Sequence, residues 1–94
     1  GAAFSELTDK QKETYGISAG VEVTAMTEGK FQRAGIRKGF IILNINGEII
    51  DSADTIERIY DDIQKSASRD KVMFISGIYP SGKSAYYAVN LASE

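Results

Sequence analysis

Apolar residues are concentrated most densely between residues 40 and 45, where Phe-Ile-Ile-Leu-Asn-Ile contains a single polar side chain. The run is too short for a typical helix and is bounded by Gly39 and by Asn46-Gly47, so it predicts a strand buried on both faces. Asn-Gly tolerates a positive φ at both centres of a tight hairpin turn. Upstream, Ala34-Gly35-Ile36 is typical of a helical turn that ends in a left-handed glycine. We expect the rest of the chain to pack against this central strand.

The first 26 residues predict a short strand, a short helix and a second strand. Residues 1–7 favour the first strand. Thr8 and Gln11 form a capping-box pattern at the start of a polar, superficial helix over residues 9–15, which Gly16 ends. In the second strand, apolar and polar positions alternate as in a half-buried strand, with the apolar side made by Val21, Val23 and Ala25.

The second half of the chain predicts one substantial helix and a final pair of strands. Residues 53–65 follow the N-cap Asp51-Ser52 and carry apolar residues at helical spacing, namely Ile56, Ile59, Tyr60 and Ile63. Strands over residues 72–79 and 84–91 flank a turn at residues 80–82. This order of elements predicts an α+β, mainly β fold, namely a small, mainly antiparallel, partly open barrel capped by helices.

Composition narrows the possible functions. The 94 residues suffice for one domain, and a net charge of −2 gives no basic footprint for nucleic acid. The chain has no cysteine and no histidine, which removes Ser-His-Asp and Cys-His catalysis and nearly every transition-metal site. The helix carries the acidic residues Glu57, Asp61 and Asp62, where we expect a solvated face rather than a metal or acid–base site. We therefore expect no enzyme activity from this domain alone, no cofactor and no nucleic-acid partner.

Residues 77–84 match the phosphate-binding pattern GxxxxGKS letter for letter. That chemistry needs a strand before the loop and a helix after it, whose first amides face the phosphates. The following residues, Ala-Tyr-Tyr-Ala-Val, favour a strand instead, and no room remains for a further strand carrying a magnesium-binding aspartate. The pattern therefore predicts a hairpin turn, and we expect no nucleotide ligand. The Tyr86-Tyr87 pair is expected to serve packing.

Residues 29–50, GKFQRAGIRKGFIILNINGEII, closely resemble the core signature of PDZ domains in bacterial Deg/HtrA-family serine proteases. The matching residues are Ala34-Gly35-Ile36, Gly39, Ile41-Ile42 and Ile45-Asn46-Gly47. The resemblance extends to the entry strand at residues 15–23 and to the groove helix at residues 52–63. It implies a PDZ-like, partly open antiparallel β-barrel of five to six strands capped by two helices, with residues 1–94 as a single PDZ domain.

Three features depart from the family pattern. Phe40 stands where the family usually has aspartate, and Lys30-Phe31-Gln32-Arg33 replaces residues that are usually small. The family's carboxylate-binding loop, a glycine-and-apolar sequence before the first strand, is represented only by Gly1-Ala2. We interpret the chain as cut within that loop.

The resemblance implies a peptide-binding module. A PDZ domain accepts an extended peptide, usually a C-terminus, as an added strand beside an edge strand. On this chain the receiving strand would be residues 2–5, the opposite wall would be the helix over residues 53–60, and amides near the N-terminus would receive the terminal carboxylate. The candidate peptide-binding residues are Gly1, Ala2, Ala3, Phe4, Ser5, Ala53, Ile56, Glu57 and Tyr60.

These residues are expected to play different parts. Phe4 and Ile56 fit the core and the groove floor equally well, whereas Ile59 and Ile63 are assigned to the core. Tyr60 is the better groove residue, because its ring can line a pocket while its hydroxyl reaches water. Ala2 leaves a roomier pocket than a leucine or isoleucine, so we expect a bulky apolar terminal residue in the ligand. Glu57 is expected to favour a basic or polar ligand side chain nearby.

Two functions stay open at this stage. In the first, the domain is tethered to a trypsin-like serine protease and captures C-terminal or unfolded segments to regulate or feed it. In the second, the domain is a degenerate PDZ module that joins protease subunits, which an expected exposure of Phe31 and Phe40 would favour. The resemblance also implies a periplasmic location.

Overall fold

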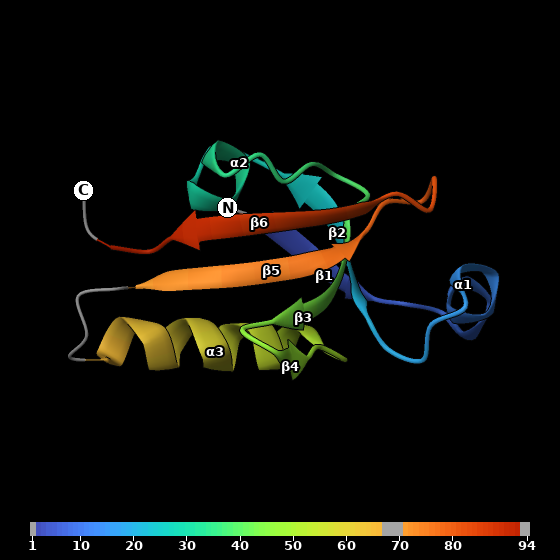
Figure 1. Ribbon diagram of the computed structural model, residues 1–94, viewed down its shortest axis with the longest axis horizontal. Helices are drawn as coiled ribbons and strands as arrows, with labels where there is room; N and C mark the ends of the chain where they lie inside the picture. Colours follow the sequence, from blue (N-terminus) through green and yellow to red (C-terminus); the bar gives the residue numbers. More distant parts are fainter. Residues whose placement is uncertain (1, 67–70, 93–94) are drawn as a thin grey trace.

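In a computed structural model the chain, described over residues 2–66 and 71–92, forms a six-stranded antiparallel sheet in the order β1-β2-β3-β5-β6, with β4 paired to β3 (Figure 1). The strands at the two ends of this order, β1 and β6, do not pair with each other, so the predicted mainly antiparallel, partly open barrel is confirmed. The elements are β1 Ala2–Glu6, α1 Asp9–Tyr15, β2 Val21–Met26, α2 Lys30–Arg33, β3 Ile41–Ile45, β4 Glu48–Ile49, α3 Ala53–Lys65, β5 Val72–Ile78 and β6 Ser84–Asn90.

The central strand β3 is buried on both faces, as its apolar run predicts. Ile42 and Ile45 lie in the main hydrophobic core with the buried residues of α3, β5 and β6. Ile41 is also buried, and its side chain lies beside Leu7 and Leu43 around Gly20, outside that main core. Asn46 and Gly47 follow with φ angles of 51° and 83°, the left-handed pair that the tight β3–β4 turn requires.

Phe40 lies in the core, and the expectation that it is exposed is wrong. Its side chain is 0 % accessible to solvent. The ring packs against Tyr79 at a centroid distance of 4.9 Å and, edge to face, against Tyr87 at 5.1 Å. The aromatic ring therefore fills space between the start of β3 and the β5–β6 hairpin. Phe31 is half-buried and packs against the core rather than standing free.

A β-bulge in β2 also changes which residues of that strand are buried. The pairing with β1 skips one residue, because Ala3 lies opposite Ala25 whereas Phe4 lies opposite Val23. An extra residue shifts the alternation of faces by one position. Ala25 is consequently exposed, contrary to the expected pattern, and Met26 packs against the core in its place.

The GxxxxGKS segment forms a β-hairpin, as predicted. Gly77 lies within β5, Ser84 begins β6, and Gly82 donates its backbone N–H to the carbonyl of Tyr79 at 2.8 Å across the turn. A Cβ atom at Gly77 would lie only 1.9 Å from the carbonyl oxygen of Ile41. The glycine is therefore needed for the close approach of β3 and β5.

The helices begin where the sequence predicts. Thr8 accepts a hydrogen bond from the Gln11 backbone and donates its own N–H to the Gln11 side chain, completing the capping box of α1. Figure 1 shows α1 at one end of the molecule, away from the long helix α3. Ser52 caps α3, whose Ile56 and Ile59 enter the core. Across residues 2–66 and 71–92, no helix has the length and apolar content needed to span a membrane.

One face of the sheet carries exposed apolar side chains. Antiparallel partners share a face, and Ile49, Asn44, Ser76 and Tyr86 pair in one row across four strands. Phe74 lies two residues before Ser76 and therefore on the same face. The exposed fractions are 67 % for Ile49, 64 % for Phe74 and 80 % for Tyr86. We call these three residues the outer sheet face.

Candidate functional site

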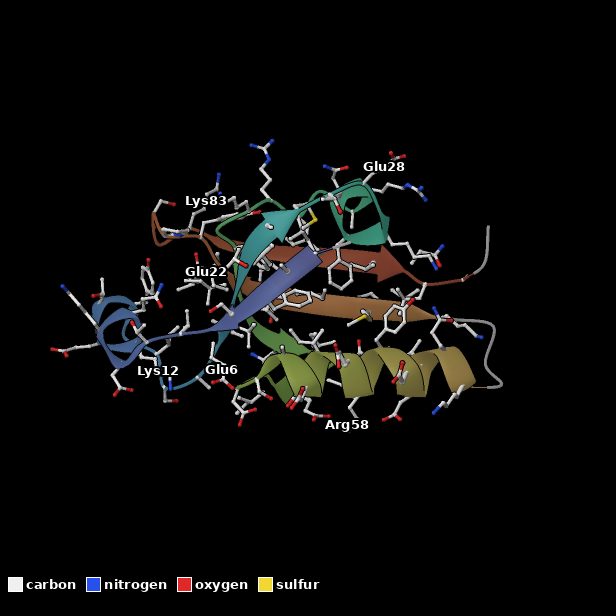
Figure 2. The ribbon with its side chains drawn as sticks, turned by 180° about the vertical axis from the view of Figure 1, so that it is seen from behind. Glu6, Lys12, Glu22, Glu28, Arg58 and Lys83 are labelled. Atoms are coloured by element: carbon white, nitrogen blue, oxygen red, sulfur yellow. The ribbon has the colours of Figure 1, made fainter. Side chains whose placement is uncertain are left out.

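The candidate site lies between the edge strand β1 and the helix α3. β1 pairs with β2 alone among the strands, so its other edge carries no strand partner within the described part of the chain. α3 contacts β1, and Figure 2 shows Glu6, at the end of β1, beside the first turn of α3. The two elements run in opposite directions along the molecule (Figure 1). The arrangement leaves a row of main-chain groups on β1 facing the region beside the helix.

The predicted receiving strand alternates in burial. Ala2 and Phe4 are half-buried and pack against the core, whereas Ala3 and Ser5 are exposed. The Phe4 ring meets Phe31 of α2 edge to face, with 5.9 Å between centroids. Gly1, which we assigned to carboxylate binding, lies outside the described residues. Phe4 therefore contributes to the core beneath β1.

The predicted helix residues divide by their position on α3. Ile56 is buried within the core, and Ile59 and Ile63 also pack there, as expected. Ala53 is half-buried, while Glu57 and Tyr60 are exposed. Tyr60 is thus the predicted helix residue with a large side chain available to a ligand.

A cavity of about 330 Å³ lies at the start of β1 and brings Ala2 and Tyr60 together. We call it the groove cavity; its remaining lining residues are Gly29, Lys30, Phe31 and Leu91. These four residues were absent from the predicted site. Phe31 carried a signal, since it is a bulky residue at a position the family usually keeps small. Lys30 carried the same signal, as part of the same replaced segment, but Leu91 carried none, because its meeting with Lys30 depends on how the end of β6 approaches α2.

Hydrogen bonds hold the walls of the groove cavity together. Lys30 Nζ donates to the Leu91 carbonyl at 3.0 Å, and Gln64 Nε2 lies 3.3 Å from both that carbonyl and the Tyr60 hydroxyl. An ammonium group has three N–H donors, so Lys30 keeps donors for a ligand after bonding Leu91. The cavity therefore combines apolar walls with a cation at its rim.

The arrangement suits binding rather than catalysis. A free strand edge offers N–H and C=O groups in the spacing that another extended chain matches. The described residues contain no group of three or more acidic, histidine or cysteine side chains placed to hold a metal ion. The chemistry available at this site is main-chain hydrogen bonding, apolar contact and one cation.

Sequence comparisons point to one family. A family model for the PDZ-like domain matches residues 1–66. A probable periplasmic serine endoprotease DegP-like of Pseudomonas fulva (strain 12-X) is 29 % identical over 68 residues, covering 72 % of this chain and 14 % of the relative. A protein of the same description from Ectopseudomonas mendocina (strain ymp) is 31 % identical over the same coverage. The chain thus spans about one seventh of the length of these relatives.

Solved structures show the same fold. The crystal structure of the HtrA3 PDZ domain bound to a phage-derived ligand has a TM-score of 0.73 and 15 % identity, covering 96 % of this chain and 80 % of that chain. The HtrA-type protease AlgW with a decapeptide has a TM-score of 0.76 and 19 % identity, covering 98 % of this chain and 27 % of that chain. The matched family model shows that the chain belongs to the PDZ-like domain family, and the relatives and solved structures that it resembles are DegP-like or HtrA-type proteins.

Proposed function

We propose that this domain binds a polypeptide C-terminus or an unfolded segment as an added strand along β1. The observation that carries the proposal is the free edge of β1 beside α3, with the groove cavity at its start. Main-chain hydrogen bonds to β1 would supply affinity independent of sequence, and the cavity would select one side chain. The peptide ligands named for the HtrA3 PDZ domain and for AlgW support this class of partner.

The groove cavity suits the last residue of a ligand. Its volume of about 330 Å³ accommodates a bulky apolar side chain against Ala2, Phe31 and Tyr60. The ammonium of Lys30 would attract the terminal carboxylate, in addition to the amides at the start of β1. Because one added strand buries little area, we expect a dissociation constant on the order of micromolar.

The parent protein is proposed to be a trypsin-like serine endoprotease located in the periplasm, as the names of the relatives suggest. In that setting the domain would deliver or sense polypeptide segments for a catalytic domain elsewhere. Glu57, exposed on α3, would favour a basic or polar ligand side chain by about 0.5 kcal/mol.

The test is a titration of the domain with a peptide ending in leucine, followed by amide chemical shifts. We expect saturable shifts at residues 2–5 and 53–60 and at the other lining residues of the groove cavity, residues 29–31 and 91, and weaker binding when the peptide C-terminus is amidated. Tyr60→Ala should weaken binding by about fivefold to thirtyfold, since it removes a wall of the groove cavity. Tyr86→Ala is the matched control, because that tyrosine is exposed on the outer sheet face.

A result without shifts in residues 2–5 would overturn the proposal. Equal losses for Tyr60→Ala and Tyr86→Ala would argue against the groove cavity as the selecting pocket. Circular dichroism of both variants would verify that the fold is retained.

The outer sheet face favours a second function, the joining of protease subunits. Several exposed apolar side chains on one face of a folded domain often mark an interface. Here the residues are Ile49, Phe74 and Tyr86, instead of the Phe31 and Phe40 considered from the sequence. In the full parent protein, Phe74→Ser should then reduce the oligomer size in sedimentation without altering peptide binding. Unchanged oligomers would remove this second function.

A further inference from the structure

A second cavity, of about 690 Å³, lies between the loop after α2 and the β5–β6 turn. Its lining includes Arg37 and Lys38 from the loop, together with Tyr79, Pro80 and Lys83 around the turn. We call it the basic cavity. It shares no lining residue with the groove cavity. Figure 2 shows Lys83 at the turn, on the opposite side of the molecule from Arg58 of α3.

The charge of the basic cavity opposes that of the domain. The chain has a net charge of −2, yet the lining contains Arg37, Lys38 and Lys83 and no acidic residue. Within residues 2–66 and 71–92, none of these three cations forms an ion pair or a side-chain hydrogen bond, whereas Arg58 pairs with both Glu48 and Asp62. All three are exposed. The cavity therefore concentrates positive charge that no described carboxylate neutralises.

The hydroxyl groups of the basic cavity add another donor. The Arg37 backbone N–H donates a hydrogen bond to the Tyr79 hydroxyl, with 3.3 Å between nitrogen and oxygen. The hydroxyls of Tyr79 and Tyr87 are hydrogen-bonded to each other. Burial, and then the hydrogen bond to Tyr79, raise the pKa of Tyr87 to about 12. Either hydroxyl can be the donor in the bond between the two tyrosines, and whichever one accepts keeps its own O–H for a ligand.

We propose that the basic cavity binds an acidic polypeptide segment in which carboxylates flank an apolar side chain. The carboxylates would lie against Arg37, Lys38 and Lys83, and the apolar side chain against Pro80 and the Tyr87 ring. Arginine and lysine bind carboxylates through charge-assisted hydrogen bonds, and a cavity of this size accommodates several residues of an extended chain. Inorganic phosphate would occupy only a small part of it, and the turn starts no helix whose amides could cradle a phosphate. This site is independent of peptide addition at β1.

The experiment uses a blocked pentapeptide with a central phenylalanine between two pairs of glutamates. The matched control peptide has glutamine at all four acidic positions. At constant ionic strength, we expect the acidic peptide to give saturable amide shifts at residues 35–38 and 79–85, and the glutamine peptide to give none. Lys38→Ala/Lys83→Ala should weaken binding by about tenfold or more, because each removes one attractive cation.

Lys10→Ala/Lys65→Ala is the control variant, since it makes the same change in net charge with exposed lysines elsewhere. It should bind the acidic peptide as the unaltered domain does, and both variants should bind a leucine-ended peptide at β1 equally. Equal weakening by the two double variants would overturn the proposal, because binding would then follow net charge alone. The proposal also fails if the glutamine peptide binds as tightly as the acidic peptide, or if the shifts fall on residues 2–5. It fails too if inorganic phosphate, at equal ionic strength, binds more tightly than the acidic peptide and displaces it.

Discussion

Gly77→Ala should destabilise the domain by more than any single substitution on its surface. The added Cβ would lie 1.9 Å from the Ile41 carbonyl oxygen and 2.8 Å from the Phe40 ring, whereas ordinary contacts begin at 3.4 Å. Both neighbours are fixed, because one is main chain and the other is fully buried. β3 and β5 would have to separate by about 1.5 Å to reach an ordinary contact, which stretches hydrogen bonds of about 2.9 Å beyond their useful range.

The cost follows from these displacements. Losing two ladder hydrogen bonds at about 1 kcal/mol each, together with overpacking of about 1–3 kcal/mol, gives a decrease of about 3–5 kcal/mol in the free energy of unfolding. The free energy of unfolding of a small domain is about 5–15 kcal/mol in total, so this loss is a large share of it. At about 4 °C or more per kcal/mol, the melting temperature should fall by about 12 °C or more. Urea unfolding followed by circular dichroism measures the difference directly.

Gly82→Ala is the matched control, since it is the other glycine of the same motif. No atom lies within 4 Å of its added Cβ, and only the φ of 90° disfavours alanine. We expect a cost of about 1 kcal/mol there. The steric reasoning is refuted if Gly77→Ala costs no more than Gly82→Ala, because the strands would then separate without losing their pairing.

Three further predictions concern titration, capping and surface charge. In the folded state the pKa of Tyr87 is raised from 10.0 to about 12. Its contribution to the unfolding free energy is therefore complete below pH 10 and is lost as the pH rises from 10 to 12. In urea unfolding over that pH range, Tyr87→Phe should show a smaller decrease of the unfolding free energy. Thr8→Ala removes the α1 capping box and should lower the unfolding free energy by about 1 kcal/mol, with amide exchange increased at residues 9–12. Arg58→Ala removes two exposed ion pairs and should change stability by less than about 1 kcal/mol in thermal unfolding, a larger loss indicating a cooperative network.

The sequence predicted features that depend on neighbouring residues. Thr8 and Ser52 cap the starts of α1 and α3, Gly16 ends α1, and the Asn46-Gly47 pair fixes the β3–β4 turn, so these features lie where expected. The strand-forming residues after Lys83 likewise indicated a hairpin within GxxxxGKS. These signals need no knowledge of the tertiary structure.

Features that depend on distant segments were missed. The bulge that buries Met26 instead of Ala25 arises from the pairing of β2 with β1, which alternation within β2 does not encode. The burial of Phe40 depends on the tyrosines of the β5–β6 hairpin. Lys30 and Leu91 meet in the groove cavity although 61 residues separate them. Part of the site is thus assembled by the closure of the fold.

The remote position of α1 has a practical consequence. Its residues are all at least partly exposed, and its tie to the sheet includes the hydrogen bond from Gln11 to Glu22 at 3.0 Å. Exposed connecting segments of this kind tolerate added chain better than the elements they join. A fluorophore attached at Lys10 should therefore report on the rotational motion of the domain, and a short peptide tag there should allow its immobilisation, without perturbing either ligand cavity.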